Sequence, residues 1–178
     1  SKYARDLAIA CNNLSYVLRK RDTDAAFQMA EEAVAILERL ANSQADEGTF
    51  EDELALCYNN LAALETGRNR VLEAGRWHLK AIVLQKQLVR KAPSVVRHRS
   101  DLAVSLNNLG VVYCHLEQPK SADNAFARAQ QLFTTLAGDY PDELAYRSSF
   151  AALLNNQALA LAKAGRGDEA LHIYPAAI

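Results

Sequence analysis

Residues 106–113 read Leu-Asn-Asn-Leu-Gly-Val-Val-Tyr, and the Asn-Asn pair within this stretch recurs along the chain at a nearly constant interval. The four pairs begin at Asn12, Asn59, Asn107 and Asn155, so that the intervals are 47, 48 and 48 residues. Five residues before each pair stands a leucine or phenylalanine that is followed by alanine. A period of roughly 20 to 50 residues with helical patterning is typical of a solenoid, in which each repeat buries its apolar face against its neighbours.

The apolar spacing inside one repeat predicts a helical hairpin. A stripe at i, i+4 and i+7 runs from Leu102 to Tyr113, and a second run from Ala122 to Phe133 follows a break at residues 117–120. Within that break, Pro119 suits the first turn of a helix. The sequence therefore predicts an all-α chain, a right-handed α-solenoid of antiparallel helical hairpins with seven complete helices and a shortened eighth. The predicted repeats, which form one continuous domain, are residues 3–49, 50–97, 98–145 and a partial fourth at 146–178.

Small residues recur at one point of each first helix. The third repeat has Gly110 there, and the others have Ser15, Ala62 and Ala158. We expect these residues to let neighbouring helices approach closely, because a larger side chain would keep them apart.

The third repeat resembles the tetratricopeptide pattern. The matching residues are Leu106-x2-Leu109-Gly110-x2-Tyr113, followed by Ala122-x3-Phe126 and Ala129, with leucine in place of the initial tryptophan. The long repeat with its Asn-Asn pair is similar to tetratricopeptide arrays of kinesin light chains and of planctomycete-type bacterial serine/threonine kinases. This resemblance implies a scaffold that binds proteins and has no active site of its own.

Composition favours a folded helical chain and excludes several partners. Half of the 178 residues are apolar, and only 7 glycines and 4 prolines interrupt them. The formal net charge of −1 gives no general field that would attract nucleic acid or an anionic membrane. The sequence has no long apolar run and no signal-peptide pattern at its start, which predicts a cytoplasmic protein. The three cysteines are widely separated, and we expect them to be reduced core thiols.

Motifs that carry chemistry are missing from the sequence. It contains no phosphate-binding glycine loop, no kinase triplet, no nucleophile elbow and no zinc-protease motif. The stretch Gly165-Arg166-Gly167 falls where the other repeats have the turn between their helices, so we interpret it as a turn. The four histidines are dispersed. The prediction is therefore a segment that is not an enzyme and that binds no metal or cofactor.

The asparagine pairs supply the candidate binding site. In the third repeat, Asn108 points about 200° away from Leu106 when each residue advances about 100° around the helix. The second asparagine of each pair should thus lie on the wall formed by the first helices, which the resemblance identifies as the peptide groove. An amide can both donate and accept, so such a row suits the main chain of an extended peptide. The alternative is that these amides bond neighbouring helices. The predicted groove residues are Asn13, Asn60, Asn108, Asn156, Tyr16, Lys20, Val104, Val111, His115 and Lys163.

Two functions follow from this interpretation. The first is a protein–protein interaction scaffold that binds a peptide or partner domain in the concave groove. The alternative is a regulatory or spacer segment of a larger bacterial signalling enzyme, such as a serine/threonine kinase. The expected partners are proteins or peptides rather than nucleic acid or membrane. Because the last repeat is shorter than the third, we also expect an incomplete, apolar C-terminal end that self-associates or is disordered, formed by Leu171, Ile173, Tyr174 and Ile178.

Overall fold

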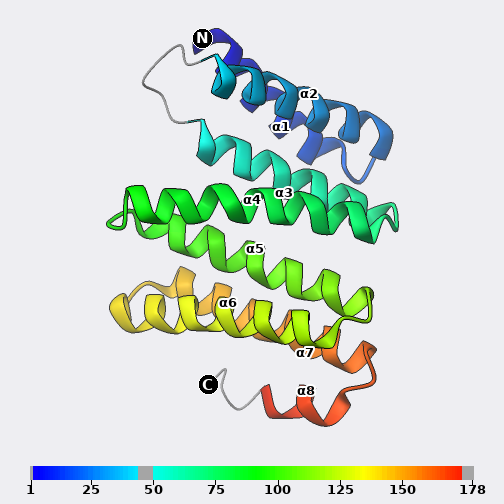
Figure 1. Cartoon of the computed structure of the whole chain (residues 1–178), viewed down its shortest axis with the longest axis vertical. Helices are drawn as coiled ribbons and strands as arrows, with labels where there is room; N and C mark the ends of the chain where they lie inside the picture. Colours follow the sequence, from blue (N-terminus) through cyan, green and yellow to red (C-terminus); the bar gives the residue numbers. More distant parts are fainter. Residues whose placement is uncertain (1, 44–49, 174–178) are drawn as a thin grey trace. The chain divides into compact units, whose positions relative to one another are not determined.

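Eight helices make up the part of the chain that this computed structural model describes, residues 2–43 and 50–173 (Figure 1). They are α1 (Lys2–Leu18), α2 (Thr23–Asn42), α3 (Glu51–Gly67), α4 (Val71–Lys91), α5 (Val96–His115), α6 (Pro119–Asp139), α7 (Leu144–Lys163) and α8 (Gly167–Ile173). No strand occurs in these described residues. The predictions of an all-α chain of helical hairpins and of seven long helices followed by a short eighth are confirmed.

The chain divides into two compact units, Ser1–Leu88 and Val89–Ile178. We call them unit 1 and unit 2. Unit 1 contains α1 to α3 and most of α4, and unit 2 contains the end of α4 and α5 to α8. Each repeat range predicted from the sequence holds two helices, while the repeat boundaries themselves stay predictions.

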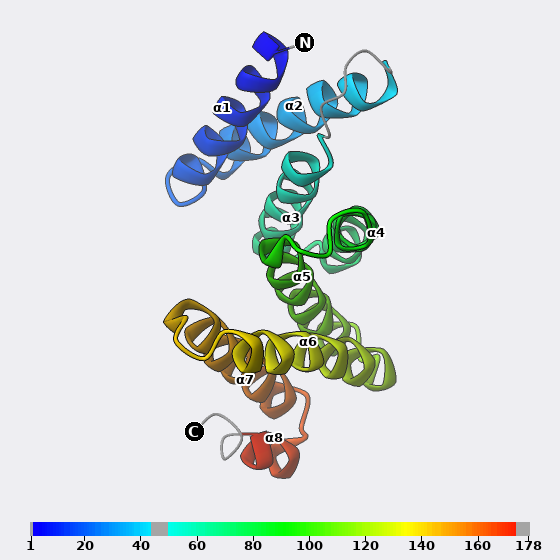
Figure 2. The ribbon, with the colours of Figure 1, turned by 90° about the vertical axis from the view of Figure 1, so that its left-hand side faces the viewer.

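The core of unit 1 forms where α2 packs on α1 and α3 packs on both of them (Figure 2). Alanines of α2 at 26, 30 and 33 are fully buried, which allows close helix contact, and Leu37 and Leu61 fill the space beside them. Tyr58 of α3 stacks on Trp77 of α4 with ring centroids 5.5 Å apart, and its hydroxyl donates to Glu38 of α2 at 2.7 Å. The aromatic stack therefore lies within the second hairpin, and the hydrogen bond from Tyr58 joins that hairpin to the first.

The core of unit 2 centres on two phenylalanines of α6. Phe126 and Phe133 are both fully buried, and Phe133 stacks on Phe150 of α7 with centroids 6.1 Å apart. A Cβ atom added at Gly110 of α5 would lie 2.5 Å from the ring of Phe126. The predicted need for a small residue is confirmed at this position, and the group that approaches it is the aromatic ring.

Three of the four turns that join the two helices of a hairpin have the same backbone conformation. One residue in each has a positive φ, and these residues are Asn69 at 60°, Glu117 at 56° and Gly165 at 77°. Their spacing is 48 residues. The next amide in each turn donates to a carbonyl five residues earlier, in the pairs Arg70 to Glu65, Gln118 to Tyr113 and Arg166 to Leu161. This is a Schellman-type helix ending, which satisfies terminal carbonyls by backbone alone.

The turn between α1 and α2 is built differently. The side chain of Asp22 accepts a hydrogen bond from the amide of Ala25 at 2.9 Å and so caps the N-terminus of α2. Of the predicted turn at Gly165-Arg166-Gly167, Gly165 and Arg166 lie between α7 and α8, and Gly167 is the first residue of α8.

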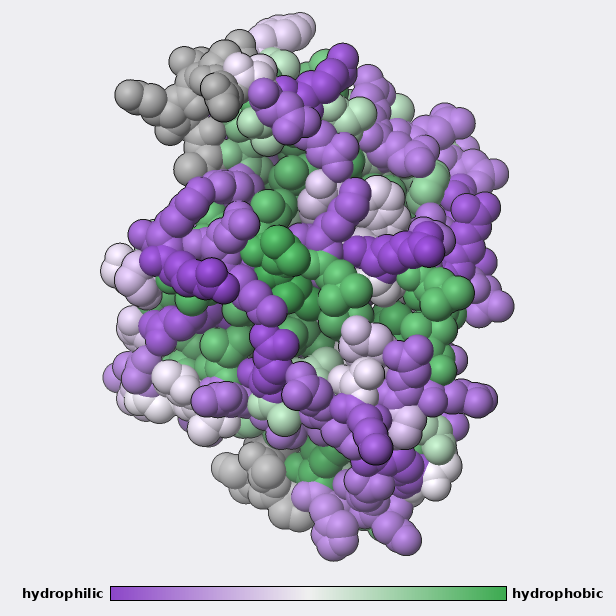
Figure 3. All heavy atoms as spheres, in the orientation of Figure 1, coloured by the Kyte–Doolittle hydropathy of each residue, from purple (hydrophilic) through white to green (hydrophobic). Residues whose placement is uncertain are grey.

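Hydrophobic residues are visible among hydrophilic ones on the face that Figure 3 presents. At the end of unit 2, Leu171 is 69% exposed and Ile173 is half-buried. Tyr174 and Ile178, which complete the predicted apolar end, lie outside the described residues. None of the described helices combines the length and apolar character required to cross a membrane.

Candidate functional site

The first helices of the two hairpins in unit 2, α5 and α7, lie in contact along one side of that unit. Their buried and exposed positions follow the predicted helical phase, because Leu102, Leu106 and Leu109 are buried whereas Val104 is 43% exposed. On α7, 55 residues after Val104, Leu159 is 52% exposed. We call the surface of these two helices the α5–α7 wall, defined by Val104, Asn108, Val111, His115, Asn156, Leu159 and Lys163.

The corresponding residues of unit 1 lie on α1, α3 and the turn after α1. Asn13 and Tyr16 are exposed on α1, and the guanidinium of Arg19 lies 5.1 Å from the centre of the Tyr16 ring. Lys20 is exposed in the turn, two residues beyond the end of α1. Asn60 of α3 is half-buried. We call this set the α1–α3 wall, defined by Asn13, Tyr16, Lys20 and Asn60.

The two asparagines of a pair have different surroundings. The first asparagine is buried in two of the four pairs, with Asn12 and Asn107 each 4% exposed. The second asparagine lies nearer the surface, half-buried at Asn60 and Asn108 and exposed at Asn13 and Asn156. That the second asparagine of each pair lines a peptide groove stays a prediction.

One of the predicted groove amides is engaged within unit 1. The Nδ2 atom of Asn60 donates to Oδ1 of Asn12 at 2.7 Å, which joins α3 to α1 across 48 residues of sequence. The structural role weighed in the sequence analysis is therefore present at Asn60. The bond gives a donor to the Oδ1 atom of the buried Asn12, which would otherwise lack a partner.

Asn59 also bonds within unit 1. Its Oδ1 atom lies 2.8 Å from Nδ1 of His78 on α4, and an amide oxygen can only accept, so the imidazole Nδ1–H donates. Burial lowers the pKa of His78 to about 4, because the charged imidazolium is disfavoured away from water. His78 is therefore a neutral core histidine at physiological pH.

The same bond is not made in unit 2. Asn107 occupies the position of Asn12, and its Oδ1 atom is buried without a hydrogen-bond partner among the described residues. Asn156 occupies the position of Asn60 and is exposed. The amide of Asn156 is thus on the surface of the α5–α7 wall, whereas that of Asn60 is used for helix packing.

We expect Asn60→Ala to lower the free energy of unfolding by about 1 kcal/mol, because Asn12 loses its hydrogen-bond donor. The matched control is Asn156→Ala, an exposed position whose amide makes no such bond, where we expect a change within about 0.5 kcal/mol. Urea unfolding followed by circular dichroism measures both. Equal effects at the two positions would contradict the assignment.

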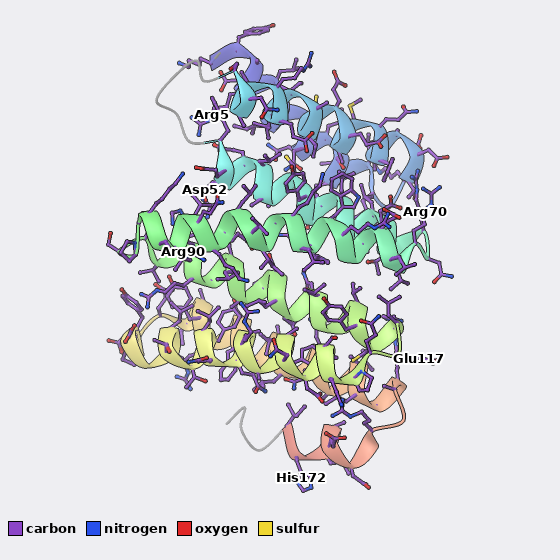
Figure 4. The ribbon with its side chains drawn as sticks, in the orientation of Figure 1. Arg5, Asp52, Arg70, Arg90, Glu117 and His172 are labelled. Atoms are coloured by element: carbon purple, nitrogen blue, oxygen red, sulfur yellow. The ribbon has the colours of Figure 1, made fainter. Side chains whose placement is uncertain are left out.

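A cleft of about 640 Å³ lies at the turn end of the α5–α7 wall. It brings together two of the predicted groove residues, His115 from α5 and Lys163 from α7. The turn between α5 and α6 forms one side of it, where Glu117 lies (Figure 4). The lining residues are Cys114, His115, Glu117, Gln118, Pro119, Ala160, Lys163, Ala164 and Arg166.

Arg166 holds the elements around this cleft together. Its guanidinium bonds Asp123 of α6 at 2.8 and 3.2 Å and Glu169 of α8 at 2.6 and 2.5 Å. Hydrogen bonds to Glu169 and Asp123 raise the pKa of Arg166, which stays charged. The sequence pattern predicts Arg166 only as a turn residue, and this role is not visible in it. The turns at 117–119 and 164–166 fall at nearly the same point of successive repeats. Because they follow the adjacent first helices α5 and α7, they must lie close together, and this could have indicated the role of Arg166.

The three cysteines are free in the structure. Cys11 and Cys57 are buried, and Cys114 is half-buried beside the cleft. Burial raises the pKa of Cys57 to about 12, so that thiol stays protonated at neutral pH. In the described ranges, no group of three or more histidine, cysteine, aspartate or glutamate side chains is arranged to hold a metal ion.

Comparison with known families gives matches to the first and third hairpins. The family model described as "Tetratricopeptide repeat" matches residues 7–46 and 102–139. These ranges cover most of α1 with α2 and most of α5 with α6. A search of curated protein sequences gives no significant match. The two family matches support a tetratricopeptide repeat array, which agrees with the resemblance found in the sequence.

Proposed function

We propose that this chain is a protein-interaction module that binds an extended peptide segment on the α5–α7 wall. Tetratricopeptide repeats generally mediate protein–protein interaction, and two hairpins of this chain match that family. The observation that carries the proposal is the exposure of Val104 on α5 and of Leu159 on α7, two helices that lie in contact. The same two helices carry Asn108, which is half-buried, and Asn156, which is exposed. Exposed apolar side chains beside unpaired amides are the features of a peptide-binding surface.

The chemistry of this wall indicates what kind of segment fits it. The amide side chains can pair with a peptide main chain irrespective of its sequence, while Val104 and Leu159 favour apolar side chains. The cleft at the end of the wall, with His115 and Lys163, takes the polar end of the segment. In unit 1 the amide of Asn60 is bonded to Asn12, which favours unit 2 as the part that makes main-chain contacts.

The test uses a library of random linear peptides displayed on phage and selected on the whole 178-residue chain. We expect an enriched peptide whose affinity, measured by fluorescence anisotropy, falls at least about tenfold in each of Val104→Glu and Leu159→Glu. Both positions are exposed, so these variants should keep their helical circular dichroism signal.

The matched control is Val83→Glu on α4, a position that is 55% exposed and outside both walls. This variant should bind the enriched peptide as the wild type does. Peptides that bind all three variants equally, or a library from which nothing is enriched, would refute the proposal.

The alternative function, a regulatory or spacer segment of a larger bacterial signalling enzyme, is supported by the resemblance of the Tyr-Arg-x-x-Phe-Ala-x-x-Leu-Asn-Asn phrase at residues 146–156 to segments of bacterial kinases. It is compatible with peptide binding. Sequencing the complete gene decides it, because a kinase signature set in the same reading frame would establish the larger enzyme and its absence would reject it.

A further inference from the structure

The N-terminal helix of the chain has an apolar face that the described residues leave uncovered. It consists of five residues spaced three or four apart, and we call it the α1 face: Tyr3, Leu7, Ala10, Leu14 and Val17. The exposed fractions of its four large side chains are 86%, 44%, 46% and 62%. Residues at this spacing lie along one side of an α-helix and form a continuous stripe.

The same register is buried on the next first helix of unit 1. The residues 47 positions later, at the start of and along α3, are each at most 8% exposed, and they are Phe50, Leu54, Cys57, Leu61 and Leu64. They belong to one core cluster with residues of α1 and α2. In this chain, the stripe is thus the surface by which a first helix packs on the hairpin before it.

Three residues of the last hairpin of unit 2 match part of the other half of such a junction. These residues correspond in register to residues of α1 and α2 that contact the α3 region, and all three are exposed. Asn155 corresponds to Asn12, Asp168 to Asp24 and Leu171 to Phe27. We call Asn155, Asp168 and Leu171 the α7–α8 face.

The contacts made within unit 1 show what these residues do when they are covered. Asn12 accepts from Asn60, as described above. Arg68, in the turn after α3, forms an ion pair with Asp24, and its guanidinium lies 4.1 Å from the centre of the Phe27 ring. The junction therefore combines an apolar stripe, one amide pair and one arginine that both pairs with a carboxylate and covers an apolar side chain.

Two residues beside the α1 face could form the amide pair and the ion pair of such a junction. Asn13 stands 47 residues before Asn60 and is exposed, and Arg21 stands 47 residues before Arg68 and is exposed. Placed on the α7–α8 face of another molecule, Asn13 would meet Asn155 and Arg21 would meet Asp168. The amide pair and the charge pair are both complementary, and this is the reason for assigning the occupant to a second copy rather than to an unrelated helix.

We propose that copies of this chain associate head to tail, with the α1 face of one molecule packed on the α7–α8 face of the next. The interface repeats the junction between the first hairpin and α3 inside unit 1. It is heterologous, because the two contacting surfaces differ. It goes beyond the proposed peptide binding and uses none of the residues of the α5–α7 wall.

Sedimentation equilibrium of the whole chain over a wide range of concentrations tests the proposal. We expect the average mass to rise with concentration. A variant of the α1 face, Leu7→Gln with Leu14→Gln, and a variant of the α7–α8 face, Asn155→Lys with Asp168→Lys, should each weaken association by at least about tenfold. The matched control, Leu79→Gln with Val83→Gln on α4, removes two equally exposed apolar residues and should leave association unchanged.

Mixing the two interface variants distinguishes head-to-tail association from a symmetric dimer. One variant keeps an intact α7–α8 face and the other an intact α1 face, so an equal mixture should form a one-to-one dimer with wild-type affinity and no larger species. A symmetric contact between two α1 faces would be lost in the first variant and not restored by mixing. A wild-type chain that stays monomeric at every concentration, or association that the α7–α8 variant leaves intact, overturns the proposal.

Discussion

Replacement of Phe126 by alanine is expected to lower the free energy of unfolding by about 3–5 kcal/mol, the largest effect that we predict for a single residue. Phe126 is fully buried and clusters with Ala122 and Ala160, around which Val111, Tyr113 and Cys114 pack. Alanine would leave a cavity where the ring stood, and the loss of its contacts with these neighbours would destabilise the fold. Urea unfolding followed by circular dichroism measures the loss, and Val83→Ala at an exposed position is the control, with an expected change within about 0.5 kcal/mol.

The effect of Gly110→Ala should change sign with the residue at position 126. In the wild type the added Cβ would lie 2.5 Å from the Phe126 ring, and overpacking of this kind costs about 1–3 kcal/mol. In the Phe126→Ala background the ring is gone, and the same substitution should stabilise the protein by about 1 kcal/mol through helix propensity. An effect of equal sign and size in both backgrounds would show that the ring does not determine the residue at 110.

The first hairpin already has a pairing of residues like the one that the double variant Gly110→Ala with Phe126→Ala would create. The first hairpin has Ser15 where the third has Gly110, and Ala30 where the third has Phe126. A small residue on the second helix thus accompanies a larger residue on the first. The volume at this contact is shared between two positions, so a change at one is tolerated when the other compensates.

Glu65→Leu is expected to raise the free energy of unfolding at neutral pH by about 1–4 kcal/mol. Glu65 is 3% exposed, and its Oε2 atom accepts no hydrogen bond in the described part of the chain. The Nε atom of its ion-pair partner Arg70 lies 3.8 Å from Oε2. The equivalent positions in the first and fourth repeats hold Leu18 and Leu161. Leucine should therefore fit the site and remove a poorly compensated buried charge. Glu32→Leu, at an exposed position on α2, is the control for added apolar surface.

The pH dependence of this effect has a definite sign. Burial raises the pKa of Glu65 above its ordinary value, although Arg70 and Arg68 act in the opposite direction. The folded state therefore holds the proton more tightly than the unfolded state, whose glutamate titrates near pH 4.3. The cost of the buried charge is absent below that pH and grows as the pH rises through the folded-state pKa. The stability difference between Glu65→Leu and the wild type should thus shrink as the pH falls, and a difference independent of pH would contradict this account.

Local features were readable from the sequence because short-range rules determine them. The helices follow from the i, i+4, i+7 spacing, and the turn before α6 follows from Pro119 at its first position. The need for Gly110 was also visible, since a small residue recurs there in every repeat. These features depend on residues within one helix or one turn.

The partners of the polar side chains could not be read in the same way. The sequence places Asn12 and Asn60 at equivalent points of successive repeats, but the bond between them depends on the distance between α1 and α3. Asn107 and Asn156 have the same spacing in register and make no such bond. Arg166 likewise reaches Asp123 across 43 residues. Contacts of this kind depend on how far one helix stands from another, which the periodic pattern leaves open.

The backbone-only helix endings at Asn69, Glu117 and Gly165 have a consequence for how the sequence can vary in evolution. Because main-chain groups close these three turns, the side chains displayed there are under little pressure from folding. Glu117, at one of these turns, also lines the cleft of unit 2, whereas Arg166, next to another turn, is held by its bonds to Asp123 and Glu169. Variation at the turn position Glu117 can therefore alter the lining of the cleft while the helices around it persist, so the surface that we propose for peptide binding can diverge faster than the fold.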